Sequence, residues 1–127
     1  VRAIVGELDE WVSVQQIQSQ IQAINLCGGE ASVRIVTGAA HSFDKEEKVH
    51  VIPEASVAPN APTIFLDPDG AMIDPYSGSS SAIATDRTHF LQAVEAGYGR
   101  RGASIGGTKE HQEIFRDDML SFHKSNF

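Results

Sequence analysis

Two short apolar runs separated by an amphipathic segment constrain the fold most strongly. Residues 1–5 (VRAIV) and 32–36 (SVRIV) are rich in β-branched side chains, which favour buried strands. The segment 13–26 between them carries apolar side chains at helical spacing, and the glycines of the following CGG favour the end of a helix. The apolar positions are Val14, Ile17, Ile21 and Ile24. The order strand, helix, strand predicts a parallel βαβ unit and an α/β fold class.

The remainder of the chain predicts a small hairpin and two further helices. Residues 63–75 (TIFLDPDGAMIDP) favour two short strands around a Pro-Asp-Gly turn. Helical patterns follow over residues 86–96 and 108–123, the second with Thr108 as its cap. The glycine-rich stretch 97–107 between these helices is expected to be irregular.

Charge and composition exclude several classes of protein. The chain has 127 residues and a formal net charge of −7, so it would be repelled by a phosphate backbone, and no nucleic-acid partner is expected. No apolar run approaches the roughly 20 residues that a membrane span needs, so no membrane association is expected. A single cysteine suits a reducing compartment and predicts a cytoplasmic location. The five histidines lack metal-ligand spacing, and neither a metal nor another cofactor is expected.

His41 follows the second predicted strand and is a candidate catalytic base. Functional groups in parallel sheets gather beyond the carboxyl ends of the strands, where the loops after neighbouring strands meet. The loop after the first strand offers three carboxylates, those of Glu7, Asp9 and Glu10. One of them could orient the imidazole of His41 as in a catalytic triad. The alternative is a loop histidine that bonds a nearby carbonyl group.

The segments GELDEWVS (6–13) and VRIVTGAAHSFD (33–44) together resemble the C-terminal part of the dienelactone hydrolase family, within the α/β-hydrolase superfamily. The resemblance implies that Asp9 is the triad acid and His41 the triad base. The closing segment HQEIFRDDMLSFHKSNF is also similar to the last helix of that family. The implied fold is a C-terminal fragment of an α/β-hydrolase, with a βαβ unit at 1–44, an insertion at 45–107 and a C-terminal helix at 108–127.

The resemblance also implies a nucleophile that this sequence does not contain. In the family, a Cys or Ser on a strand-turn-helix elbow precedes the acid, but no G-x-S-x-G or G-x-C-x-G motif occurs here. Cys27 lies between acid and base at the far end of the predicted helix, and is expected to be a small buried hydrophobic residue. Residues 1–5 already have the pattern of a strand, which favours a truncated or processed chain lacking the nucleophile-bearing part.

The intact protein is therefore expected to hydrolyse a small-molecule ester or lactone through a Cys/Ser-His-Asp triad, whereas this chain alone is expected to be inactive. The alternative is a non-catalytic fragment that acts as an assembly or interaction module. In either case the strand edges left unpaired favour a homo-oligomer that completes the sheet between chains.

A third interpretation, nucleotide binding, depends on the spacing of Gly97, Gly99 and Gly102, which matches G-x-G-x-x-G. The dinucleotide fingerprint must follow a strand and open a helix, whereas here a helical pattern comes first. A glycine-rich loop packed against the protein, with Arg100 and Arg101 anchoring nearby carboxylates, is the better interpretation.

Overall fold

The βαβ unit predicted for the first 36 residues is present in the computed structural model, which describes residues 1–127. Strand β1 (Arg2–Gly6) pairs in parallel with β2 (Ser32–Val36), and helix α1 (Val14–Leu26) connects them. Gly6 lies opposite Val36 in the register, so both strands end at the same edge of this two-stranded sheet. The loops that carry the candidate acid and base therefore leave the sheet side by side.

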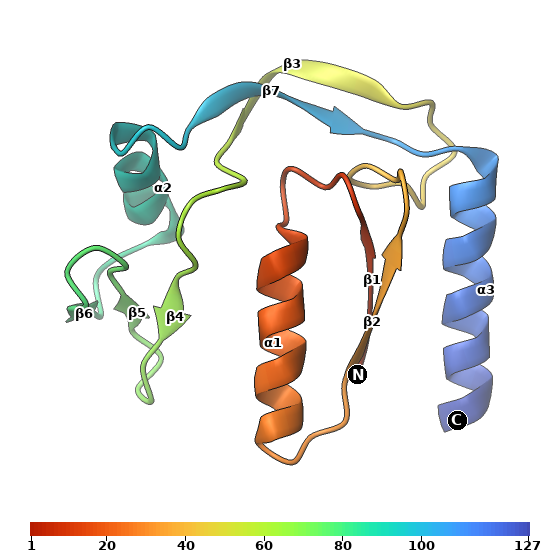
Figure 1. Ribbon diagram of the computed structural model, residues 1–127, viewed down its shortest axis with the longest axis horizontal. Coiled ribbons are helices and arrows are strands. Elements are labelled where there is room, and N and C mark those ends of the chain that lie inside the picture. Colours follow the sequence, from red (N-terminus) through yellow and green to blue (C-terminus); the bar gives the residue numbers. More distant parts are fainter.

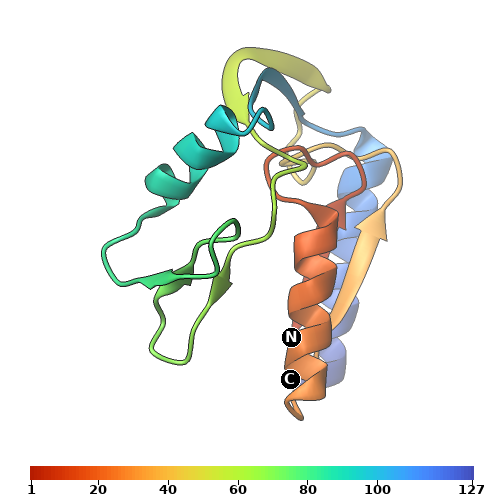
Figure 2. The same ribbon diagram turned by 60° about the vertical axis from the view of Figure 1, so that its left-hand side comes forward.

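Helices lie on both sides of this small sheet. Helix α1 lies on one side and α3 (Lys109–Asn126) on the other (Figures 1 and 2). Thr108 caps α3 as predicted, because its side chain accepts a hydrogen bond from the backbone N–H of His111. A core cluster of Val36, Ala39 and Phe43 fills the space between sheet and α3, where Phe43 meets Phe115 edge to face.

A long antiparallel ribbon arches over the carboxyl edge of the sheet (Figure 1). It consists of β3 (His50–Val57) and β7 (Arg100–Ile105). The prediction that residues 97–107 are irregular is therefore wrong, because six of them form β7. The register shifts between Ile52 and Ser56, and this irregularity includes Pro53, which has no N–H to donate to a ladder.

A second lobe lies at the end of the ribbon that is farther from α3 (Figure 1). The predicted hairpin is present as β4 (Phe65–Leu66) and β5 (Met72–Ile73), and a third strand, β6 (Ser80–Ser81), extends it. Helix α2 (Asp86–Glu95) follows and leads into β7. The glycine motif after α2 thus runs from a helix into a strand, the reverse of the order that nucleotide binding requires.

Helices alternate with small sheets along the chain, so the fold class is α/β in the broad sense. Only 13 of the 127 residues are buried, and the core is correspondingly small. Cys27 corrects the sequence prediction, because it is exposed at the end of α1 rather than buried. No other segment covers the last turn of this helix, where the neighbouring Leu26 is 80% exposed. None of the helices has the length and apolar character needed to cross a membrane.

Candidate active site

The loops after β1 and β2 are joined by backbone hydrogen bonds. The N–H of Glu7 donates to the carbonyl of Val36 and that of Leu8 to the carbonyl of Ala39, both at 2.9 Å. Gly6 permits this close approach, because a Cβ there would lie 2.5 Å from the carbonyl oxygen of Ala39 and 2.6 Å from that of Ala40. A side chain at residue 6 would therefore force apart the two loops that carry the candidate acid and base.

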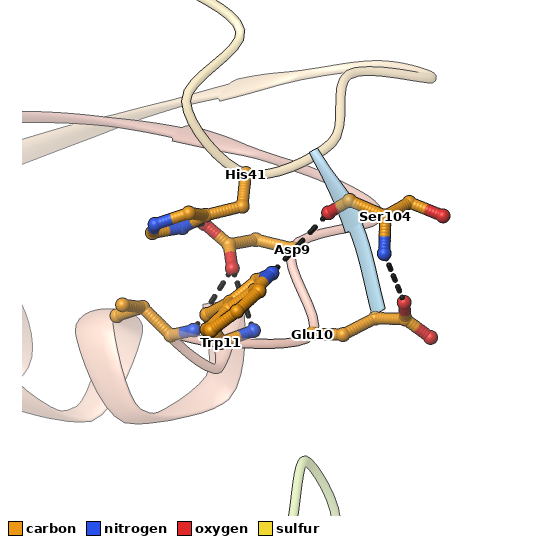
Figure 3. Close-up of polar contacts among 6 residues, drawn as sticks. Asp9, Glu10, Trp11, His41 and Ser104 are labelled. Carbon is orange, nitrogen blue, oxygen red and sulfur yellow. Dashed lines mark hydrogen bonds and ion pairs between the residues drawn. The ribbon is translucent and has the colours of Figure 1, made fainter. Parts of the chain in front are cut away.

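Asp9 and His41 meet where these loops join. His41 Nδ1 lies 2.9 Å from Asp9 Oδ2, and the two side chains point toward one another in Figure 3. The side chain of Asp9 is only 8% exposed, whereas that of His41 is 33% exposed. The alternative prediction, that His41 bonds a nearby carbonyl group, is wrong, because Nδ1 of His41 contacts the carboxylate of Asp9.

The second oxygen of Asp9 is held by the backbone. Oδ1 accepts hydrogen bonds from the N–H groups of Trp11 and Val12, each at 2.8 Å. This local arrangement is typical of Asp in a turn that leads into a helix, here α1. Because Oδ1 is occupied by two donors, Oδ2 is the oxygen left to face the imidazole.

The contact with Asp9 sets the proton arrangement of neutral His41. A carboxylate only accepts hydrogen bonds, so Nδ1 must carry the proton that it donates to Oδ2. The lone pair of neutral His41 is then on Nε2, which has no hydrogen-bond partner within the chain. This is the tautomer that a general base of the triad type needs, since Nε2 can take a proton while the carboxylate stabilises the imidazolium that forms.

Trp11 stacks on the ring of His41 and was not foreseen from the sequence. The ring centroids are 5.4 Å apart and the planes are inclined by 29°. Trp11 Nε1 donates to the carbonyl of Ser104 in β7, at 3.3 Å, so the indole is held between the loop and the ribbon (Figure 3). The indole therefore covers one side of the imidazole and restricts its rotation. The one available signal was the position of the chain's single tryptophan, two residues after Asp9.

The other two acids of the first loop have different partners. Glu7 accepts a hydrogen bond from the N–H of Gly38 at 2.8 Å and so ties the two loops together. Glu10 accepts from the N–H of Ser104 at 3.1 Å and forms an ion pair with Arg100. The expected anchoring of Arg100 by a carboxylate is thus confirmed. Of the three candidate acids, only Asp9 reaches His41.

The ribbon also holds the backbone of His41. The N–H of Gly106 donates to the carbonyl of His41 at 2.8 Å, and His41 forms an isolated parallel bridge with Ile105. These contacts could not be found from the sequence, because the stretch that makes them was predicted to be irregular.

No nucleophile or metal site accompanies the pair within this chain. Cys27 is at the opposite end of α1 from the Asp9 loop, about 20 Å away along the helix, since each of its thirteen residues rises about 1.5 Å. No serine or threonine hydroxyl bonds Nε2 of His41, and no group of three or more His, Cys, Asp or Glu side chains could hold a metal ion. The arrangement has the geometry to accept and deliver a proton at Nε2 of His41.

In comparisons with known proteins, neither a family model, a curated protein nor a solved structure matched this chain.

Proposed function

We propose that Asp9 and His41 are the acid and base of a Cys/Ser-His-Asp triad in a carboxylic ester or lactone hydrolase of the dienelactone hydrolase type. The chain would be the C-terminal part of an α/β-hydrolase fold. The observation that supports this proposal most directly is the 2.9 Å contact between His41 Nδ1 and the nearly buried carboxylate of Asp9. A catalytic base of a triad requires a shielded carboxylate that orients Nδ1 and an Nε2 free to take a proton, whereas a structural loop histidine requires neither.

In this reaction, His41 Nε2 takes the proton of the thiol or hydroxyl nucleophile as that group attacks the carbonyl carbon of the substrate. Asp9 stabilises the imidazolium, and His41 then protonates the leaving alkoxide. In the second half, His41 takes a proton from the water that attacks the acyl-enzyme, and it returns this proton to the Cys or Ser as the carboxylic acid product leaves. The reaction needs no cofactor.

The nucleophile would be a Cys or Ser on an elbow outside residues 1–127. An acid and a base alone do not catalyse acyl transfer, so the 127-residue chain is expected to be inactive by itself. Hydrolysis of p-nitrophenyl acetate by this chain should not exceed that of free imidazole at equal concentration. Robust turnover by the chain alone, abolished in His41→Ala, would contradict the proposal.

The catalytic roles are tested in a polypeptide that also contains the elbow segment encoded upstream. We expect Asp9→Asn to lower kcat about 10⁴-fold, the loss typical of a triad whose acid can no longer fix the imidazole. His41→Gln should also reduce kcat severely. His50→Gln is the matched control, because His50 lies on β3 in an exposed contact with Glu47 and should leave kcat unchanged. A coding region with no elbow motif upstream would exclude the hydrolase.

A second candidate function is that of a non-catalytic assembly module. It is favoured by the sheet formed by β1 and β2, which has only two strands and therefore two unpaired outer edges. The proposed partner is a second copy of this chain, which would continue the sheet across the interface. Light scattering at high concentration should then give a dimer or larger assembly, and a monodisperse monomer would exclude this candidate.

A further inference from the structure

A cleft of about 280 Å³ lies where the start of α1, the end of β3 and the second lobe meet. Its lining brings together three aromatic side chains from separate parts of the chain, those of Trp11, Tyr76 and Phe90. Most of the remaining lining consists of aliphatic side chains and prolines. A dry cavity of about 150 Å³ is enough for benzene, so this cleft has room for a small organic ligand.

The lining of this cleft carries one carboxylate and no lysine or arginine. The carboxylate is that of Asp86, in the first turn of α2. Asp86, His89, Phe90 and Ala93 all line the cleft, and their spacing places them on one face of the helix. Asp86 forms no ion pair within the chain, so no cationic side chain of the protein neutralises its charge.

Aromatic rings and a carboxylate together favour a cationic ligand. The ring faces of Trp, Tyr and Phe carry partial negative charge and attract cations, the indole most strongly. Asp86 adds a full negative charge to the same lining, and the formal net charge of −7 attracts cations to the molecule as a whole.

The apolar walls restrict which cation fits. A metal ion such as Mg²⁺ or Ca²⁺ needs several oxygen ligands, whereas the cleft offers one carboxylate, and no group of three or more His, Cys, Asp or Glu side chains occurs in the structure. A primary ammonium needs acceptors for its three N–H groups. A quaternary ammonium has no N–H group, and its charge is covered by alkyl groups that can lose water against aliphatic and aromatic side chains.

We propose that this cleft binds a small organic cation of the quaternary ammonium type, held against Trp11, Tyr76 and Phe90 with Asp86 as the counter-charge. An uncharged ligand of the same shape would take Asp86 out of water without replacing the lost hydration, which costs free energy. Binding requires no turnover, and the proposal therefore stands or falls separately from the hydrolase.

The test compares choline with 3,3-dimethylbutan-1-ol, in which a carbon atom replaces the charged nitrogen and the shape is nearly the same. Trp11 is the only tryptophan, and its indole N–H donates to the carbonyl of Ser104, so a single resonance reports binding in the unaltered chain. At constant ionic strength we expect choline to shift this resonance saturably, with a Kd about 2- to 30-fold lower than that of the alcohol, the usual range for a cation–π contact.

Variants locate the charge that attracts the cation. Asp86→Asn keeps the size of the side chain and should weaken choline binding about 2- to 5-fold without changing that of the alcohol. Asp69→Asn is the matched control, because it makes the same change of charge in an exposed turn of the same lobe, outside the cleft. Tyr76→Leu keeps an apolar side chain, removes a half-exposed ring and should reduce the preference for choline.

The comparison of choline with the alcohol in the unaltered chain needs no variant to fold. Equal or tighter binding of the alcohol to that chain would overturn the ligand class, and no saturable shift with either compound would overturn the site. If Asp69→Asn weakens choline binding as much as Asp86→Asn, the net charge of the chain attracts the cation and the assigned role of Asp86 is wrong.

Discussion

The substitution Asp9→Asn tests directly whether the carboxylate sets the tautomer of His41. Oδ1 of Asp9 accepts from two backbone N–H groups, those of Trp11 and Val12, at 2.8 Å each. An asparagine amide must keep its oxygen on these donors, and its NH₂ group then faces His41 Nδ1. Nδ1 would have to become the acceptor, which moves the proton of the neutral ring to Nε2.

The size of this effect follows from the two backbone hydrogen bonds. Turning the asparagine amide the other way would lose both, at about 0.5–1.5 kcal/mol each, or about 1–3 kcal/mol in total. That difference favours the orientation in which the amide oxygen accepts from Trp11 and Val12 about 5- to 150-fold. More than about four fifths of neutral His41 should therefore carry its proton on Nε2. The lone pair needed for general-base catalysis would then be missing.

Long-range ¹H–¹⁵N correlation spectra at alkaline pH distinguish the two tautomers in the 127-residue chain. The unaltered chain should show the proton on Nδ1 and the Asp9→Asn variant on Nε2. Glu7→Gln is the matched control, because it makes the same change of charge in the same loop but touches Gly38 rather than His41. If Nδ1 keeps its proton in Asp9→Asn, the carboxylate does not fix the imidazole and the reasoning is refuted.

Two further predictions concern stability. Arg2 in β1 donates hydrogen bonds of 2.8 and 2.9 Å to Asp118 in α3, and these bonds lower the pKa of Asp118. Their contribution to the free energy of unfolding should be complete above pH 3.8, the ordinary pKa of an aspartate, and should be lost as the pH falls through the lowered pKa. Urea unfolding at several pH values should show this loss of stability, and the loss should be absent from the Arg2→Met variant. If the variant keeps the same dependence on acid pH, the contact between Arg2 and Asp118 is not its source. Gly6→Ala should destabilise the chain by about 1–3 kcal/mol, because its Cβ would overlap the carbonyls of Ala39 and Ala40. A urea midpoint unchanged from that of the parent chain would show that the loops do not depend on this approach.

Local sequence patterns predicted the elements that pack one apolar face on a neighbour or close a tight turn. The apolar spacing of α1 follows from its packing on the sheet, and the turn at 67–70 follows from Pro and Gly. The β3–β7 ribbon has no such signal. Half of its positions are exposed, no strict alternation of apolar and polar residues marks it, and Pro53 interrupts one strand. His50 pairs with Ile105 across a long stretch of chain, and no local pattern encodes that pairing.

The same distinction applies to the candidate site. The meeting of Asp9 and His41 could be predicted because parallel neighbouring strands end at one edge, which brings the loops that follow them together. Which of the three acids would reach the histidine followed only from the family resemblance, since loop geometry depends on backbone hydrogen bonds. Trp11 and Ser104 could not be paired in advance, because their contact requires the ribbon that the sequence does not reveal.

The position of β7 changes how the segment 45–107, predicted as an insertion, relates to the acid–base pair. Ser104 accepts from Trp11 and donates to Glu10, and Gly106 donates to the carbonyl of His41. These three contacts come from outside the βαβ unit, and they hold two loops that have no regular structure of their own. The segment is therefore part of the support for the pair rather than a spacer between strand and helix. It also supplies most of the lining of a cleft to which Trp11 contributes, so the indole that stacks on the imidazole of His41 is held on the ribbon side by the same segment.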